Sequence, residues 1–111
     1  MTALAPSYDI PSETTEKVKD LVKEDVESIA SIFKALSDPV RIKIVKAVGI
    51  EDLCVCIFVE VMEYHYSGLS YHLKLLKEAN LVDFRRDGSF WIYRLTDLGR
   101  EMLGIIDELP E

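Results

Sequence analysis

Apolar residues recur at three- and four-residue steps through the first third of the chain, and this spacing predicts a long amphipathic helix. The pattern begins at about Glu13 and leaves charged residues on the opposite face. The apolar stripe covers roughly five helical turns, which is long enough to serve both a core and a partner subunit. Residues 1–12 contain two prolines and no periodicity, and we expect them to form a flexible arm. The stripe consists of Val18, Leu21, Val22, Val26, Ile29, Ile32, Phe33 and Leu36.

A second helix is predicted after the break at Ser37-Asp38-Pro39. Pro39 suits the first position of a helix, and Asp38 or Ser37 suits the cap before it. Gly49 stands where this helix is expected to end. The inward-facing positions of this helix are Val40, Ile44, Val45 and Val48.

The next segment predicts a helix-turn-helix. A short third helix is expected after Asp52 and through Met62, and a turn follows over residues 63–66. A fourth helix then begins at about Ser67, and Asn80 suits its exit through a left-handed residue. The apolar positions of the fourth helix are Leu69, Leu73, Leu75 and Leu76.

Beyond Asn80 the hydrophobic spacing changes to an alternation, which is typical of strands. Two such segments, 81–86 and 89–95, flank Asp87-Gly88, a dipeptide that favours a two-residue hairpin turn. This turn gives the hairpin one apolar face and leaves Arg85 on the other. The predicted cross-strand pairs are Phe84 with Trp91 and Val82 with Tyr93.

The chain ends in a further predicted helix, capped by Thr96 or Asp97. The order of elements predicts a mainly α, α+β winged-helix fold: helix, helix, helix-turn-helix, a two-stranded β-hairpin wing and a C-terminal helix. We expect one domain over residues 13–111, with the first and last helices forming a dimer. The apolar side of the last helix carries Met102, Leu103 and Ile106.

The distribution of charge fits a protein that presents one face to DNA. The 111 residues carry a net charge of −7, which taken alone argues against nucleic acid. Residues 65–94, however, contain five basic and three acidic residues, whereas the remainder contains eight basic and seventeen acidic residues. The mildly basic segment coincides with the predicted fourth helix and hairpin, so the charge pattern permits DNA binding there.

In a winged helix-turn-helix the second helix of the motif enters the major groove and its early residues contact base edges. A hairpin tip with two adjacent arginines suits the neighbouring phosphate backbone or minor groove. Three of these residues have alternative roles, because Ser67 can cap the helix, Tyr71 can pack on the hairpin and His72 can be a surface residue without a function. The predicted DNA contacts are Tyr66, Ser67, Ser70, Tyr71, His72 and Lys74 in the helix, and Arg85, Arg86 and Ser89 in the wing.

Other classes of protein find little support in the sequence. The longest apolar run, 53–59, is too short for a membrane span, and the region after Met1 does not resemble a signal peptide. Two cysteines spaced as Cys54-Val55-Cys56 do not form a disulfide framework, so we expect a reduced, cytoplasmic chain. No phosphate loop, hydrolytic triad or zinc-hydrolase spacing indicates an enzyme. A winged-helix module that docks proteins remains the alternative to a DNA-binding regulator.

Several segments together resemble the ArsR/SmtB family of metalloregulatory repressors. The resemblance covers about residues 30–105 and implies a homodimer, double-stranded operator DNA with two-fold symmetry, and repression that an inducer relieves. It rests on Lys34-Ala-Leu-Ser-Asp-Pro-Val-Arg-Ile-Lys-Ile-Val45, Asp52-Leu-Cys-Val-Cys56, Ser70-Tyr-His-Leu-Lys-Leu-Leu-Lys-Glu-Ala-Asn-Leu-Val82 and Arg85-Arg-Asp-Gly-Ser-Phe-Trp-Ile-Tyr-Arg-Leu95.

The resemblance also implies that Cys54 and Cys56 ligate a thiophilic ion such as arsenite, antimonite, cadmium or lead as an effector, with no cofactor otherwise required. The family's acidic residue after the second cysteine is Ile57 here, and the further cysteine of three-sulfur sites falls on Val59. Completing the site therefore needs another ligand, and the candidates are Glu51, Asp52, a histidine or a small thiol.

Three roles stay open for the cysteine pair: ligation of a soft metal or metalloid, a redox switch through a strained disulfide, and small core residues without sensing. A zinc site made by His65 and His72 is a further, weaker hypothesis. The family's second metal site, on the last helix, pairs an Asp with histidines. Asp97 matches the Asp, but the histidine position is Gly99, so the sequence predicts that this site is lost.

Overall fold

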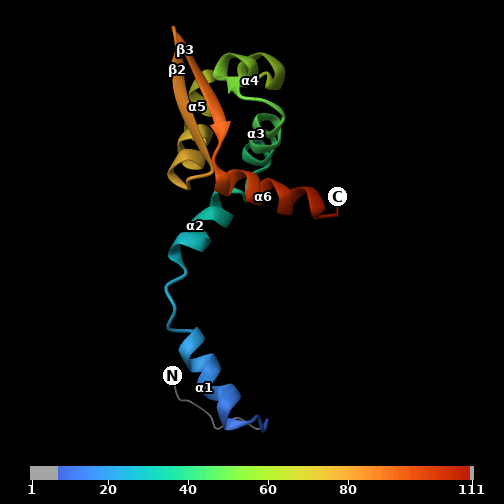
Figure 1. The fold of residues 1–111 in the computed structure, drawn as a ribbon. Coiled ribbons are helices and arrows are strands. Elements are labelled where there is room, and N and C mark those ends of the chain that lie inside the picture. Colours follow the sequence, from blue (N-terminus) through green and yellow to red (C-terminus); the bar gives the residue numbers. More distant parts are fainter. Residues whose placement is uncertain (1–7, 111) are drawn as a thin grey trace.

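The computed structural model describes residues 8–110 and consists of a winged-helix body from which an N-terminal helix projects (Figure 1). Residues 1–7 of the expected N-terminal arm lie outside the described residues. The elements are α1 (Ser12–Leu21), α2 (Glu27–Ala35), α3 (Pro39–Ile50), β1 (Leu53–Cys54), α4 (Val55–Met62), α5 (Tyr66–Glu78), β2 (Val82–Asp87), β3 (Phe90–Leu95) and α6 (Asp97–Glu108). This order confirms the predicted winged-helix fold.

The prediction of one long first helix was wrong, because the structure divides it into α1 and α2. The chain leaves α1 at Val22, and α2 begins only at Glu27. Between them the carboxylate of Asp25 accepts a hydrogen bond from the backbone N–H of Glu27 at 3.1 Å. Such a local bond gives the backbone an alternative to the hydrogen bonds of a helix. Within the described chain α1 buries none of its residues, so no packing opposes the break.

The core lies where α3, α5 and the sheet meet, and it positions the helix-turn-helix. α3 begins as predicted, with Pro39 in its first turn and Asp38 accepting from the backbone N–H groups of Val40 at 2.8 Å and Arg41 at 3.3 Å. Asn80 ends α5 with φ of 61°, as expected for a left-handed exit. The fully buried side chains are Ile44, Val45, Val48, Leu69, Leu73, Leu76, Leu81 and Val82.

Gly49 does not terminate α3, contrary to the prediction, since the helix continues through Ile50. A β-carbon at Gly49 would collide with the side chain of Leu103 in α6. The absence of a side chain at Gly49 therefore leaves room for the end of the Leu103 side chain. The cap of α6 is Thr96, whose hydroxyl accepts from the N–H of Gly99 at 3.0 Å and donates to the carbonyl of Asn80 at 2.6 Å.

The wing is part of a three-stranded antiparallel sheet with the strand order β1-β3-β2, rather than an isolated hairpin. The two loop residues are Gly88 and Ser89 instead of Asp87 and Gly88, and Gly88 has φ of +62°. The predicted pairing is therefore shifted by two residues, so that Phe84 lies opposite Tyr93. A shift of two preserves the faces, and Phe84 still meets Trp91 edge-on, with 4.9 Å between ring centroids.

The third strand, β1, was missed because only Leu53 and Cys54 form it, opposite Tyr93 and Ile92. Two residues are too few to display an alternating pattern. The pairing of β1 with β3 positions α4, because it holds the start of this helix against β3. Among the helices of residues 8–110, none is both long and apolar enough to span a membrane.

Candidate nucleic-acid interface and thiol pair

The exposed face of α5 carries four of the predicted DNA contacts in one continuous stripe. Ser67, Ser70, Tyr71 and Lys74 are all exposed and follow one another at helical spacing, opposite the buried leucines of the same helix. Tyr66, the first residue of the helix, is also exposed. The structure thus brings five of the six predicted helix residues to the surface of the helix that follows the turn.

Two of the alternative roles considered for these residues do not occur in the structure. The residue at the cap position of α5 is His65, which makes no side-chain capping bond, and Ser67 lies inside the first turn. Tyr71 lies beside a hollow that Ser31 and Lys34 of α2 also line, rather than against the hairpin. Both side chains remain available for contacts outside the protein.

His72 is the exception among the predicted contacts, because its side chain points into the protein and only 7% of the residue is exposed. Arg41 Nη1 lies 3.0 Å from His72 Nδ1, and Tyr64 Oη lies 3.3 Å from His72 Nε2. With both ring nitrogens occupied inside the protein, His72 neither reaches a base edge nor joins His65 at a zinc ion in this arrangement.

The wing carries its two arginines in different surroundings. The guanidinium of Arg86 lies over the ring of Trp91, with Cζ 4.6 Å from the ring centroid, in a cation–π contact. Arg85 Nη1 donates to Asp52 Oδ2 at 3.1 Å. Both arginines are exposed, as is Ser89 in the turn, and an exposed ion pair of this kind exchanges readily for another anion.

The helix α5 and the wing are neighbours. Lys77 Nζ of α5 lies 5.3 Å from the centroid of the Phe84 ring in β2. A hollow of about 370 Å³ lies between them. It is lined by Ser70, Leu73, Lys74, Lys77 and Glu78 of α5 and by Phe84 and Tyr93 of the hairpin. A ligand that spans α5 and the hairpin thus meets hydroxyl, ammonium and aromatic groups together with the carboxylate of Glu78.

The two thiols mark the start of α4. Cys54 is the last residue of β1 and the cap of α4, and its Sγ accepts from the backbone N–H of Cys56 at 3.3 Å. A hydrogen bond with Cys54, together with partial loss of solvation, raises the pKa of the Cys56 thiol above its ordinary value. Cys54 is half-buried and Cys56 is exposed, and both are free thiols. Core packing therefore does not account for Cys56.

The surroundings of the thiols are apolar. A hollow of about 370 Å³ beside them is walled by Val59 of α4, by Tyr66 and by the wing residues Phe90 and Trp91. The carboxylate of Asp52, one of the candidate ligands, accepts a hydrogen bond from Arg85. Across residues 8–110 no three histidine, cysteine or acidic side chains gather in a way that could hold a metal ion, so a single chain offers two sulfurs and no third ligand.

Asp97 and Gly99, the residues at the family's second metal site on the last helix, lie in different surroundings. Asp97 stands at the start of α6 and is exposed. Gly99, one turn into the helix, is buried against the backbone carbonyl of Leu81, with no space for a side chain. A histidine at position 99 would therefore not fit this packing.

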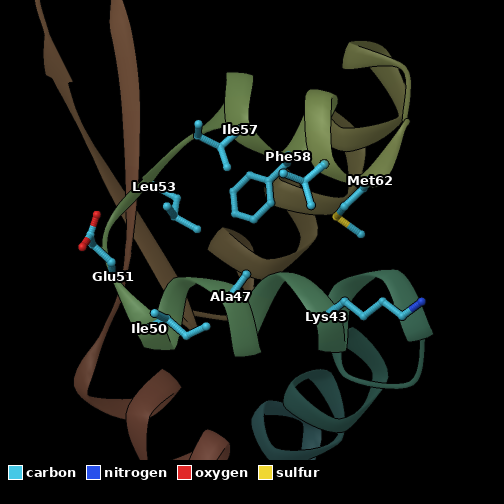
Figure 2. A pocket seen from close by; sticks show the side chains of 9 residues that line it. Lys43, Ala47, Ile50, Glu51, Leu53, Ile57, Phe58 and Met62 are labelled. Carbon is cyan, nitrogen blue, oxygen red and sulfur yellow. The ribbon is translucent and has the colours of Figure 1, made fainter.

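One surface feature was missed by sequence reasoning. An apolar hollow of about 490 Å³ lies between α3 and α4. Figure 2 shows Phe58 facing Ala47 across it, with Met62 on the side of Lys43. Its edge includes Ile50, which is 87% exposed at the end of α3. The signal in the sequence was the position of Ile50, which lies off the inward-facing stripe of its helix.

Comparisons with known proteins agree with this geometry. Residues 38–83 match the family described as bacterial regulatory protein, arsR family. The chain is 39% identical over 80 residues to a cadmium resistance transcriptional regulatory protein CadC homolog of Staphylococcus aureus, covering 71% of this chain and 66% of that protein. It is 32% identical over 97 residues to a transcriptional repressor SmtB homolog of Synechocystis, and the match covers 83% of this chain and 74% of that protein. NolR of Sinorhizobium fredii has a similar structure, with a TM-score of 0.66, 27% identity and coverage of 97% and 95%.

Proposed function

The chain belongs to the arsR family of bacterial regulatory proteins and is thus a DNA-binding transcriptional regulator rather than an enzyme. We propose that it represses transcription as a homodimer on a two-fold operator. Its proposed site of action is the cytoplasm, together with the DNA that it binds. The observation that carries the proposal is the exposed stripe on α5 beside a wing tipped by Arg85 and Arg86.

In this proposal α5 enters the major groove. Ser67, Ser70 and Tyr71 contact base edges, and Lys74 contacts a phosphate. Tyr66 lies at the start of the same helix, and the wing places Arg85, Arg86 and Ser89 on the adjacent backbone or minor groove. His72 is not among the base contacts that we propose, because it is buried.

The dimer is proposed to form through α1, α2 and α6. These helices expose large apolar side chains that the rest of the described chain does not cover. Two copies related by a two-fold axis present two α5 helices to half-sites about one helical turn apart. The exposed apolar residues are Val18, Leu21 and Val22 in or after α1, Val26, Ile29 and Phe33 in or before α2, and Ile105 and Leu109 in or after α6.

Cys54 and Cys56 are proposed as the effector site. The names of relatives refer to cadmium and arsenical resistance, and two close thiolates suit soft ions of this kind. The thiols lie at the junction of β1 and α4, the first helix of the helix-turn-helix, so an ion bound there acts on the element that supports α5. The third ligand then comes from a small thiol or from the second subunit.

A mobility-shift titration with the upstream region of its own gene tests the proposal. We expect a shifted complex at low salt, and an affinity that falls steeply as salt rises because phosphate contacts release counterions. Unrelated DNA of the same length should bind more weakly. Absence of any shift at low salt would contradict the proposal and would favour a winged-helix module that docks proteins.

Replacing both wing arginines, Arg85→Ala with Arg86→Ala, is expected to weaken binding to operator and to unrelated DNA by similar factors, of about tenfold. The slope of log affinity against log salt should fall by about one for each phosphate that the wing no longer neutralises. Lys43→Ala with Lys46→Ala is the matched control, since it removes the same charge from exposed positions of α3, outside the proposed DNA-binding surface and the proposed dimer helices. An unchanged salt slope in the wing variant would show that the wing does not contact phosphates.

A further inference from the structure

His72 sits at the point where the reading helix meets the rest of the protein. It lies on the buried side of α5, with Arg41 of α3 on one side of its ring and Tyr64, in the turn before α5, on the other. Arg41 is itself only 9% exposed. The edge of the His72 ring also meets Tyr71 on the exposed stripe, with 5.9 Å between ring centroids.

The donors and acceptors in this arrangement are fixed by chemistry. A guanidinium only donates, so His72 Nδ1 must accept from Arg41 Nη1 across 3.0 Å. The neutral ring then carries its proton on Nε2 and donates to Tyr64 Oη across 3.3 Å. A doubly protonated ring has no acceptor for Arg41, so the arrangement requires neutral histidine.

Arg41 extends the arrangement to the helix that precedes it. Its Nε donates to the carbonyl oxygen of Ala35 at 2.6 Å, at the end of α2. Its Nη1 also lies 4.0 Å from Asp38 Oδ2, the cap of α3. The pair of Arg41 and His72 thereby ties together the end of α2, the start of α3, the turn and α5.

We propose that His72 and Arg41 are positioning residues for DNA recognition, which set the angle between α5 and the dimer helix α2 without contacting DNA. This inference rests on the proposed function. The exposed stripe on α5 fits two half-sites only if both copies of α5 keep one orientation relative to the dimer helices. Within residues 8–110 no buried side-chain nitrogen or oxygen lacks a hydrogen-bond partner. Removing the acceptor on His72 leaves an N–H of the Arg41 guanidinium unpaired, and a shift of α5 or α2 must accommodate it.

Four variants separate the two hydrogen bonds. His72→Phe keeps the ring and removes both bonds, whereas Tyr64→Phe removes only the bond at Nε2. His72→Asn places an amide oxygen near the position of Nδ1 and retains the acceptor for Arg41. Arg41→Met combined with His72→Phe removes the guanidinium together with the ring nitrogens.

The measurements are operator affinity, affinity for unrelated DNA, and thermal unfolding of the same samples. We expect His72→Phe to lose about tenfold or more in operator affinity and less than about threefold on unrelated DNA, while remaining folded at the assay temperature. His72→Asn should recover most of the loss, and Tyr64→Phe should lose about two- to threefold. The double variant should lose at least as much as His72→Phe alone, because it removes the same link and also the bond from Arg41 to the carbonyl of Ala35.

The outcomes distinguish this inference from the proposed function. If the unmodified protein does not bind the operator, the proposed function fails. If it binds and the folded His72→Phe and Tyr64→Phe variants bind equally well, the pair serves stability alone and the inference is wrong. If His72→Phe weakens the operator complex and His72→Asn does not restore it, the link through Arg41 is wrong.

Discussion

Phe33→Glu in α2 is expected to convert the protein to a monomer and to weaken operator binding by about a hundredfold or more. Phe33 is 59% exposed on α2, as is Ile29 at 54%, and a carboxylate buried at a dimer interface without a partner is strongly unfavourable. A monomer contacts one half-site, and it loses the gain in effective concentration that the second half-site provides. Sedimentation and mobility-shift measurements on the same sample test both statements.

Val61→Glu is the matched control for this prediction. Val61 is 73% exposed on α4, outside α1, α2 and α6, so the same type of substitution there should leave the protein dimeric and bound to its operator. A dimeric Phe33→Glu variant would show that α2 lies outside the interface. A monomer with unchanged operator affinity would show that DNA is read by one copy.

The sequence predicted the body of the fold well because local signals determine most of it. Pro39 and Asp38 determine the start of α3, Asn80 determines the exit from α5, and alternation with a glycine turn determines the hairpin. The break between α1 and α2 was not predicted, since apolar spacing continues through it and the bond from Asp25 to Glu27 depends on geometry rather than periodicity. The strand β1 was missed because it forms only by pairing with a segment far along the chain.

The candidate DNA interface was predicted less completely, and His72 shows why. Its spacing from Leu69 and Leu76, at three and four residues, places it on the buried side of α5, so the helical phase carried the signal. Histidine is more often a surface residue than a core one, and the partner that stabilises it, Arg41, lies 31 residues earlier. A buried polar residue can be recognised from the sequence only when its hydrogen-bond partner can be recognised too. A single sequence does not show contacts between distant segments, so the pairing of His72 with Arg41 could not be predicted.

Cys54→Ser combined with Cys56→Ser is expected to leave operator binding intact and to abolish release by arsenite and by cadmium ion. The effector concentration that releases half of the operator should rise by about a hundredfold or more, because serine hydroxyls are poor ligands for soft ions. The chain contains two cysteines, so the double variant has no thiol left. Mobility shifts over a series of effector concentrations give this value for both proteins.

The double variant tests sensing rather than folding. Cys54 caps α4 through its Sγ, and serine is among the best residues at a helix cap, so the start of α4 should survive the substitution. Unfolding temperatures within a few degrees of each other, measured without effector, provide the control. The raised pKa of Cys56 adds a second measurement: binding a soft ion displaces the thiol protons, so release of the unmodified protein should need less effector as pH rises.

Oxidants separate the two thiol mechanisms that remain. A disulfide between Cys54 and Cys56 forms with the loss of two hydrogen atoms to the oxidant, and a reductant restores both thiols. Release by oxidant that a reductant reverses, with the matching change in mass and without response to arsenite or cadmium ion, assigns the pair to redox sensing. Release of the double variant at the same effector concentrations as the unmodified protein would contradict both mechanisms and would place the effector site elsewhere.

Since the apolar hollow beside the thiols supplies no third ligand, a small thiol added with arsenite should lower the concentration needed for release if ligation is the mechanism.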